Sequence, residues 1–214
     1  MGPRSRLLIA TTNPGKLREI RAILSGLPID LQTLADHPGV PEPEETGATF
    51  AENARRKALH YAAAIGLPAV AEDSGLTIDA LDGEPGVRSA RYDGDTYPEK
   101  FANLFAALDR RPSAGSGRPE RVEGRGVYDT AARFVCALAL ADGGRILFEA
   151  EGVVEGRITR EPRGGNGFGY DPIFLYPPYG RTLAEASTEE KLAVSHRGRA
   201  FRKLRDYLNA VREI

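Results

Sequence analysis

Six consecutive residues, TTNPGK at 11–16, have side chains suited to binding phosphate. They follow the apolar run 7–10 and precede a segment whose apolar residues recur at helical spacing, so we expect a helix to begin here. Asn13 is a good N-cap, and Pro14 suits the first helical position. The exposed N–H groups of such a turn, together with the hydroxyls of Thr11 and Thr12, predict a phosphate site. Lys16 lies in the first turn, where the helix dipole disfavours a cation unless an anion offsets it.

The alternative for this stretch is a plain capped turn with a solvated lysine. A P-loop is excluded, because that motif needs two spaced glycines and a Ser or Thr after the lysine, whereas Leu17 follows Lys16. The predicted anion site is therefore of the simpler kind that any helix N-terminus offers.

Two acidic stretches, PEPEETG (41–47) and AEDSG (71–75), offer metal ligands. We expect Glu72 and Asp73 to stand where an apolar strand ends, so that a carboxylate points into the crevice beyond the sheet. Phosphates and carboxylates in one cleft repel each other unless a divalent cation bridges them, and Mg²⁺ does so with one or two carboxylates plus substrate phosphates. The alternatives are a solvated acidic loop at 41–47 and a simple Asp-Ser-Gly turn at 73–75.

A glycine-rich stretch, GGNGFGYDP (164–172), is suited to holding a base. Phe168 stands between glycines, where a bare aromatic face can stack on a ring. Asp171 beside it could accept a hydrogen bond from a base N–H. The alternative is a glycine turn with Phe168 packed in the core.

The last basic stretch, SHRGRAFRKLRDY (195–207), opens the C-terminal helix. We expect Ser195 to act as an N-cap that separates two helices. Lys191, His196 and Arg197 could then converge, whereas one continuous helix would scatter them around its circumference. A solvated charged face is the alternative.

The remaining pattern predicts the elements that position these groups. It predicts helices at 49–65, at about 99–108 and at the C-terminus, and extended segments at 68–74, 76–81, 130–141, 145–158 and 171–175. Asp142-Gly143-Gly144 predicts a hairpin turn. Residues 110–126, rich in Arg, Gly, Pro and Ser, predict a mobile surface insertion. Helices between strands, followed by a hairpin, indicate one α/β domain with a mixed sheet.

Composition excludes several classes of protein. The chain has 41% apolar residues, 28% charged residues and a formal net charge of −1, so no global field draws it to nucleic acid or to a membrane surface. The apolar stretch 134–141 is too short to span a bilayer. The single cysteine, Cys136, is expected to be buried and allows no intramolecular disulfide. We therefore expect a cytoplasmic protein that binds neither nucleic acid nor membrane.

Taken together, these stretches resemble the Ham1 family of inosine triphosphate pyrophosphatases, which remove non-standard purine nucleoside triphosphates. The matches appear in family order and cover almost the whole chain except 110–126: TTNPGK, EETGATFAENARRKA, AEDSGL, GEPGVRSARY, ITREPRGGNGFGYDPIF and EKLAVSHRGRA. Each motif is modest alone, but six in order are hard to obtain by chance. One difference is Thr12, which stands where bacterial members usually have Gly.

The resemblance implies an elongated, two-lobed α/β fold around a long mixed twisted sheet, with the active site in the cleft between the lobes. It also implies a homodimer that needs Mg²⁺ and hydrolyses ITP, dITP, XTP and dXTP to the monophosphate and pyrophosphate. Asp73 would accept the proton of the attacking water, and Glu44 and Asp73 would hold the metal. The nucleotide would be held by Thr11, Thr12, Asn13, Pro14, Gly15, Lys16, Ser74, Phe168, Gly169, Tyr170, Asp171, Lys191, His196 and Arg197.

Two other functions remain open from the residues alone. A Maf-type nucleotide pyrophosphatase, acting on pyrimidine or modified nucleotides, would also use a strand–turn–helix phosphate site and acids, but the base-facing SHR and FGYD stretches favour a purine. A non-catalytic nucleotide-binding protein would have little need of a second carboxylate near the phosphates, so Glu44 and Asp73 argue against it.

Overall fold

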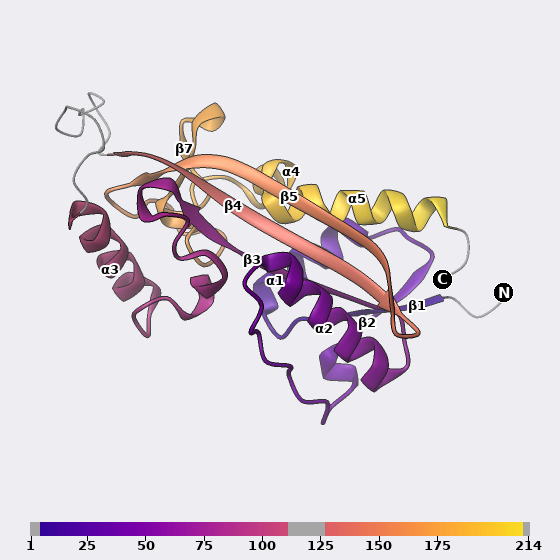
Figure 1. Ribbon diagram of the computed structural model, residues 1–214. Coiled ribbons are helices and arrows are strands. Elements are labelled where there is room, and N and C mark those ends of the chain that lie inside the picture. The colour runs from indigo at the N-terminus through magenta and orange to yellow at the C-terminus, as the bar shows by residue number, and fades with distance from the viewer. Residues whose placement is uncertain (1–4, 111–126, 212–214) are drawn as a thin grey trace. The chain divides into compact units, whose positions relative to one another are not determined.

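The computed structural model describes residues 5–110 and 127–211, and Figure 1 labels their elements. The helices are α1 (Pro14–Leu24), α2 (Phe50–Ile65), α3 (Tyr97–Arg110), α4 (Thr188–Val194) and α5 (His196–Ala210). The strands are β1 (Ser5–Ile9), β2 (Ile29–Thr33), β3 (Ala69–Ile78), β4 (Val127–Asp142), β5 (Arg145–Thr159), β6 (Phe174–Tyr176) and β7 (Arg181–Thr182). Except for Arg110, the expected insertion at 110–126 lies outside the described residues.

The strands form one mixed sheet in the order β2-β1-β3-β4-β5-β6-β7. Strand β1 pairs in parallel with β2 and with β3, whereas β6 pairs antiparallel with β5 and with β7. The turn between β4 and β5 has Gly143 and Gly144 at φ +53° and +77°, which is the positive-φ pair that a tight hairpin needs. The expected α/β fold with a mixed sheet is confirmed.

Strand β3 continues through the acidic pair, so the expectation of a strand that ends there was wrong. Its ten residues include Glu72, Asp73 and Gly75, and no Asp-Ser-Gly turn forms. Gly75 serves close packing instead, because a Cβ there would lie 2.3 Å from Ser89 Oγ. Pairing with the neighbouring strands overrides the local turn preference of these residues.

The structure divides into two compact units. Within the described residues, the first comprises the chain up to Ser74, Val135–Val153 and the residues from Val194 onward. The second comprises Gly75–Phe134 and Val154–Ala193. None of the helices in the described ranges is long and apolar enough to span a membrane.

In the first unit, α2 packs on the sheet through small side chains. Its Ala54, Ala58 and Ala62 join Tyr61 and alternate residues of three strands in one buried cluster. Because successive side chains of a strand point to opposite faces, Leu7 and Ile9 are buried on the other face. Helices α1 and α5 pack against each other. The second unit has an aromatic core in which the ring centres of Phe134 and Phe174 lie 4.4 Å apart.

Candidate active site

The first turn of α1 is capped as the sequence predicts. Asn13 Oδ1 accepts hydrogen bonds from Gly15 N at 2.9 Å and Lys16 N at 3.1 Å, and Pro14 occupies the first helical position. Thr11 Oγ1 accepts from Asn13 N at 3.2 Å. The Asn13 side chain therefore uses two of the N–H groups that were expected to meet phosphate, and an anion would bind through the remaining N–H groups, the threonine hydroxyls and Lys16.

The 11–16 turn begins where β1 ends, beside the part of β3 that precedes its two acidic residues. Leu8 pairs with Ala69 and Ile9 with Val70, and Ala10 N donates to Val70 O at 2.8 Å. Continuing this register places Thr11 and Thr12 opposite Glu72 and Asp73. Thr11 and Thr12 also line an open pocket of about 410 Å³ in the first unit. A ligand at the N-terminus of α1 is therefore close to Glu72, the ion-pair partner of Lys16.

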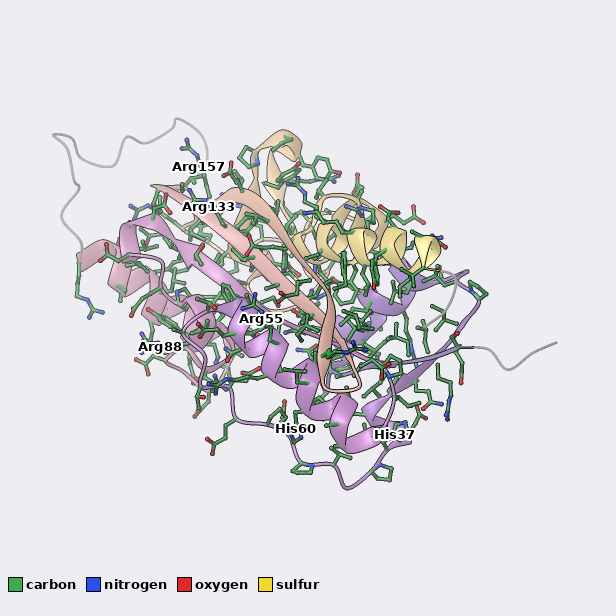
Figure 2. The ribbon with its side chains drawn as sticks, turned by 45° about the vertical axis from the view of Figure 1, so that its right-hand side comes forward. His37, Arg55, His60, Arg88, Arg133 and Arg157 are labelled. Atoms are coloured by element: carbon green, nitrogen blue, oxygen red, sulfur yellow. The ribbon has the colours of Figure 1, made fainter. Side chains whose placement is uncertain are left out.

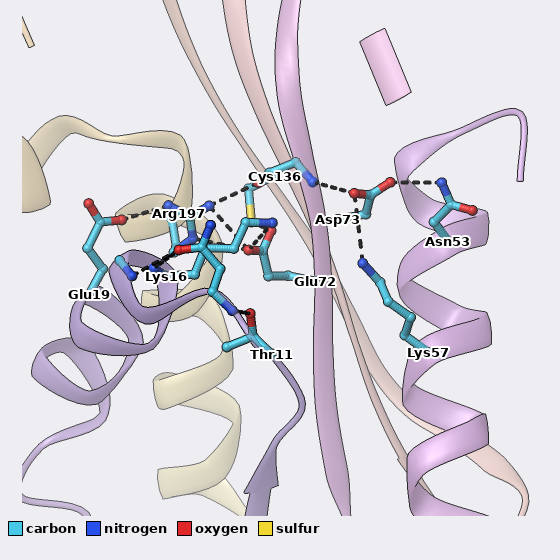
Figure 3. Close-up of polar contacts among 12 residues, drawn as sticks. Thr11, Lys16, Glu19, Asn53, Lys57, Glu72, Asp73, Cys136 and Arg197 are labelled. Atoms are coloured by element: carbon cyan, nitrogen blue, oxygen red, sulfur yellow. Dashed lines mark hydrogen bonds and ion pairs between the residues drawn. The ribbon is translucent and has the colours of Figure 1, made fainter. Parts of the chain in front are cut away.

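Glu72 is the centre of a buried ionic network (Figure 3). Its Oε1 lies 2.9 Å from Lys16 Nζ and 3.2 Å from Arg197 Nη2, while Cys136 Sγ approaches Oε2 at 3.5 Å. Arg197 Nη1 also donates to Glu19 Oε2 at 2.7 Å. Burial alone would raise the pKa of Glu72, but Arg197, Lys16 and Lys57 more than offset it, so the pKa lies below its ordinary value.

Cys136 takes part in this network only as a thiol. The side chain is buried, as the sequence predicts. Burial, and next to it the Glu72 carboxylate, raise the pKa of the Cys136 thiol well above its ordinary value. The thiol therefore stays protonated at neutral pH and cannot act as a nucleophile there.

Asp73 points to the opposite face of β3, toward α2, as the alternation of a strand requires (Figure 3). Asn53 Nδ2 donates to its Oδ2 at 2.9 Å, and Lys57 Nζ lies 3.8 Å from its Oδ1. The backbone N–H of Ser74 donates to the same Oδ1 at 3.0 Å. Burial raises the pKa of Asp73 above its ordinary value, although Lys57 and Asn53 lower it. This carboxylate is therefore a stronger base than a free aspartate.

The acidic loop before α2 brings a different glutamate to this site than the sequence analysis expected. Glu44 is exposed, whereas Glu45 is half-buried and its Oε1 lies 2.5 Å from Lys57 Nζ. Glu45 also contributes to the raised pKa of Asp73, so its charge reaches that carboxylate. The structure thus favours Glu45 over Glu44 as the second carboxylate beside Asp73.

The carboxylates of Glu45 and Asp73 are suited to binding a divalent cation. No group of three or more His, Cys, Asp or Glu side chains in the described residues is arranged to hold a metal alone. Mg²⁺ usually needs only one or two carboxylates, because substrate phosphates and water complete its shell. Glu45 and Asp73 meet that requirement, and the Lys57 ammonium between them already shows that the place attracts positive charge.

The second unit holds the expected base-contacting loop. Lys191 Nζ lies 2.5 Å from Asp171 Oδ2 and 4.5 Å from the centre of the Phe168 ring. Phe168 N donates to the same Asp171 oxygen at 2.8 Å. Phe168 is half-buried, so it is not part of the core, while Tyr170 is buried and its hydroxyl donates to Ser89 O at 2.9 Å. Gly167 must be glycine, because its φ is +76° and a Cβ would lie 2.2 Å from Asp171 Oδ2.

The break between α4 and α5 is confirmed. Ser195 Oγ accepts from Gly198 N at 3.0 Å, and α5 begins at His196. His196 and Arg197 are buried in the first unit, and Arg197 Nη2 donates to Ser74 Oγ at 2.9 Å. Lys191 belongs to the second unit with Asp171 and Phe168, so the convergence of Lys191 with His196 and Arg197 stays a prediction.

Two histidines, His37 and His60, form hydrogen bonds in the first unit (Figure 2). His37 Nε2 lies 2.7 Å from Gln32 Oε1, and His60 Nε2 donates to Pro41 O at 2.8 Å. The second contact holds the start of the acidic loop on α2.

Sequence reasoning missed several residues of the site. Glu72 was noted without a role, and Asn53, Lys57, Glu45 and Glu19 were not assigned. A signal existed for two of them: Asn53 and Lys57 are polar, four residues apart, and adjacent to the apolar stripe of α2, so they face the interior together.

Comparison with known proteins places this geometry in a family. A sequence profile of the Ham1 family matches residues 7–207. The dITP/XTP pyrophosphatase of Geobacter sulfurreducens is 47% identical over 206 residues, covering 95% of this chain and 96% of the relative. The Exiguobacterium sp. protein of the same name is 46% identical over 199 residues, covering 93% of this chain and 94% of the relative.

Solved structures agree. A HAM1 protein from Coxiella burnetii matches with a TM-score of 0.83 and 42% identity, covering 97% of this chain and all of that one (100%). The dITP/XTP pyrophosphatase from Mycobacterium abscessus matches with a TM-score of 0.70 and 43% identity, covering 93% of this chain and 97% of that one. The chain belongs to the Ham1 family.

Proposed function

We propose that this protein hydrolyses non-standard purine nucleoside triphosphates, namely ITP, dITP, XTP and dXTP, at the α–β phosphoanhydride. The products are the nucleoside monophosphate and pyrophosphate. The observation that carries the proposal is the contact between the 11–16 turn and β3. Lys16 Nζ lies 2.9 Å from Glu72 Oε1, and Asp73 is buried on the other face of the same strand. The relatives named dITP/XTP pyrophosphatase support the choice of substrate.

The triphosphate binds at the N-terminus of α1. Thr11 to Lys16 contribute hydroxyl and N–H donors, and the Lys16 ammonium offsets the charge that develops on the pyrophosphate leaving group. The cation in the first turn, disfavoured by the helix dipole, then has an anion on its other side.

Asp73 accepts the proton of the water that attacks the α-phosphorus. Its raised pKa suits a general base, because a base works best when its pKa approaches the working pH. Asn53 and the Ser74 N–H hold its two oxygens. The proton moves from water to the Asp73 carboxylate as the new phosphorus–oxygen bond forms, and the α–β bridging bond breaks.

Mg²⁺ is the proposed cofactor, with Asp73 and Glu45 as its protein ligands. When bound, it supplies positive charge to the phosphate oxygens. Glu44, the ligand expected from the resemblance, is exposed one residue earlier on the loop.

The protein distinguishes purine bases by whether the group at position 6 accepts or donates a hydrogen bond. His196 donates toward O6 of hypoxanthine or xanthine, where adenine presents an amino group, and a buried donor left unpaired can reject such an analogue by as much as about 10⁴–10⁵-fold. Arg197, the second donor expected from the resemblance, already donates to Glu19, Glu72 and Ser74. Phe168 stacks on the ring, with Gly169 and Tyr170 shaping the loop, and Asp171 and Lys191 supply further polar contacts. From the resemblance we also propose that the protein is a cytoplasmic homodimer.

The reaction is tested by incubating the protein with ITP and, separately, ATP, with and without Mg²⁺, and identifying the products by ³¹P NMR. We expect pyrophosphate and IMP from ITP only when Mg²⁺ is present, and none from the Asp73→Asn variant. Orthophosphate as the first product, or equal turnover of ATP, would contradict the proposal. Binding of ITP without turnover would favour a nucleotide-binding protein, and turnover of pyrimidine nucleotides a Maf-type enzyme.

A further inference from the structure

Asn53 connects the carboxylate of Asp73 to the acidic loop before α2. It is almost fully buried, with 1% of its surface exposed. Its Nδ2 donates to Asp73 Oδ2 at 2.9 Å, and its Oδ1 accepts from Gly47 N at 2.8 Å. One carboxamide therefore bonds two segments that are far apart in the sequence.

The two partners determine the orientation of this carboxamide. The Gly47 N–H can only donate, so it must meet the amide oxygen. An ionised Asp73 can only accept, so it must meet the amide nitrogen. No side chain with only donors or only acceptors can satisfy both partners, which explains why an amide occupies this buried position.

The loop side of the contact leaves no space for adjustment. A Cβ on Gly47 would lie 2.6 Å from Asn53 Oδ1 and 2.8 Å from the Glu52 Cβ. The backbone of the loop thus approaches Asn53 closely, two residues after Glu45. One turn further along α2, Lys57 Nζ lies 2.5 Å from Glu45 Oε1 and 3.8 Å from Asp73 Oδ1.

We infer that Asn53 is a positioning residue: it orients Asp73 for proton abstraction and fixes the acidic loop beside it through the same amide. The inference rests on the proposed function, in which Asp73 is the general base. Asn53 has no assigned contact with the substrate, so its loss should lower the rate of the chemical step more than the affinity for the nucleotide.

Two variants separate this role from simple packing. Asn53→Asp keeps the acceptor for Gly47 N but turns a second carboxylate toward Asp73, and Asn53→Leu removes both bonds without adding charge. Arg55→Ala is the control, because Arg55 is on the same helix and forms an exposed ion pair with Glu149.

With ITP and Mg²⁺, we expect both Asn53 variants to lose about 100-fold in kcat, since small misplacements of a catalytic group cost rates of this order, while KM changes by less than about threefold. Arg55→Ala should match the wild type. Unchanged kcat per folded molecule, or a rise in KM alone, would overturn the inference. If Asn53→Asp does not fold, Asn53→Leu decides. If neither folds, Gly47→Ala, which presses on the same amide oxygen, should lower kcat in the same way.

A second readout does not depend on turnover. In ¹H–¹⁵N NMR spectra without nucleotide, the Asn53 carboxamide signals, identified by their absence in Asn53→Leu, should shift in Asp73→Asn and not in Arg55→Ala. Unshifted signals would overturn the Asn53–Asp73 contact. If the signals shift but wild-type protein releases no pyrophosphate from ITP, the proposed function is wrong and the contact remains.

Discussion

Lys16 and Glu72 form a direct ion pair, with Nζ 2.9 Å from Oε1. The Glu72 side chain is 1% exposed and that of Lys16 is 19% exposed, so one partner is buried and the other reaches the surface. Glu72 is shared with Arg197, which is itself buried. The lysine in the first turn of α1 therefore has an anionic partner in the protein, and its exposed side is the side that a phosphate can approach.

Replacing Lys16 with Met should lower kcat/KM for ITP by about 100-fold, the usual cost of removing one donor that stabilises developing charge. Steady-state kinetics checks this. Lys203→Met is the matched control, because Lys203 is on an exposed part of α5 and, among the described residues, donates to the Glu151 carbonyl at 2.8 Å. Equal losses in the two variants would mean that Lys16 has no special relation to the substrate.

Glu72→Gln should destabilise the protein by up to about 3–5 kcal/mol at pH 7, because it removes one of the two carboxylates that pair with the buried Arg197 and leaves only Glu19. The pKa of Glu72 is below its ordinary value of 4.5, so its stabilising contribution is present above that pH and is lost as the pH falls. Denaturant unfolding should be measured between pH 3 and pH 7, in steps of about one pH unit. The difference in the free energy of unfolding between wild type and variant should be smaller at the acidic end.

The control for this comparison is Glu155→Gln, whose side chain is 80% exposed beside Arg133. It should leave the free energy of unfolding nearly unchanged at every pH. A Glu72→Gln difference that stays constant down to pH values of about 3 would show that the charge of Glu72 is not responsible.

Lys57→Met should move the acid limb of the pH–rate profile to higher pH. Burial raises the pKa of Asp73, and Lys57 is the strongest influence that lowers it. Without the ammonium the pKa rises further, so the base is protonated, and inactive, at a higher pH than in the wild type. The profile of kcat/KM against pH measures the shift. A limb that moves to lower pH, or not at all, would separate Asp73 from the rate-determining ionisation.

Phe168→Leu should raise KM for ITP by about tenfold, because stacking on a base contributes roughly 1–3 kcal/mol. Phe168→Tyr keeps the ring and should raise KM much less. Kinetics of the two variants under identical conditions gives the comparison. Similar KM values would indicate that Phe168 supports the loop instead of stacking on the nucleotide.

Local rules predicted the helix starts well. Asn13, Thr49 and Ser195 all cap helices as their types and positions indicate, because capping depends only on the next two or three residues. The positive φ of Gly143 and Gly144 confirms the hairpin for the same reason. Motif order was sufficient to predict the family.

Tertiary contacts determined the features of the fold and the site that local sequence patterns did not predict. The strand that we expected to end at the acidic pair continues to Ile78, because strand pairing and the packing of Gly75 on Ser89 override the local turn preference. Glu44 and Glu45 are indistinguishable by type, and only the position of Lys57 on α2 shows which one is next to Asp73. The counter-ions Glu19 and Glu72 of Arg197 come from α1 and β3, which no local pattern connects to α5.

Hydrolysis of ITP in H₂¹⁸O, followed by mass spectrometry of both products, tests the proposed reaction most directly. Attack on the α-phosphorus by water that Asp73 deprotonates places ¹⁸O in IMP and leaves pyrophosphate unlabelled. Label in pyrophosphate would mean attack on the β-phosphorus, and label in released orthophosphate would mean attack on the γ-phosphorus. Either result would contradict the assignment of Asp73 and Lys16 to the two sides of the α–β bond.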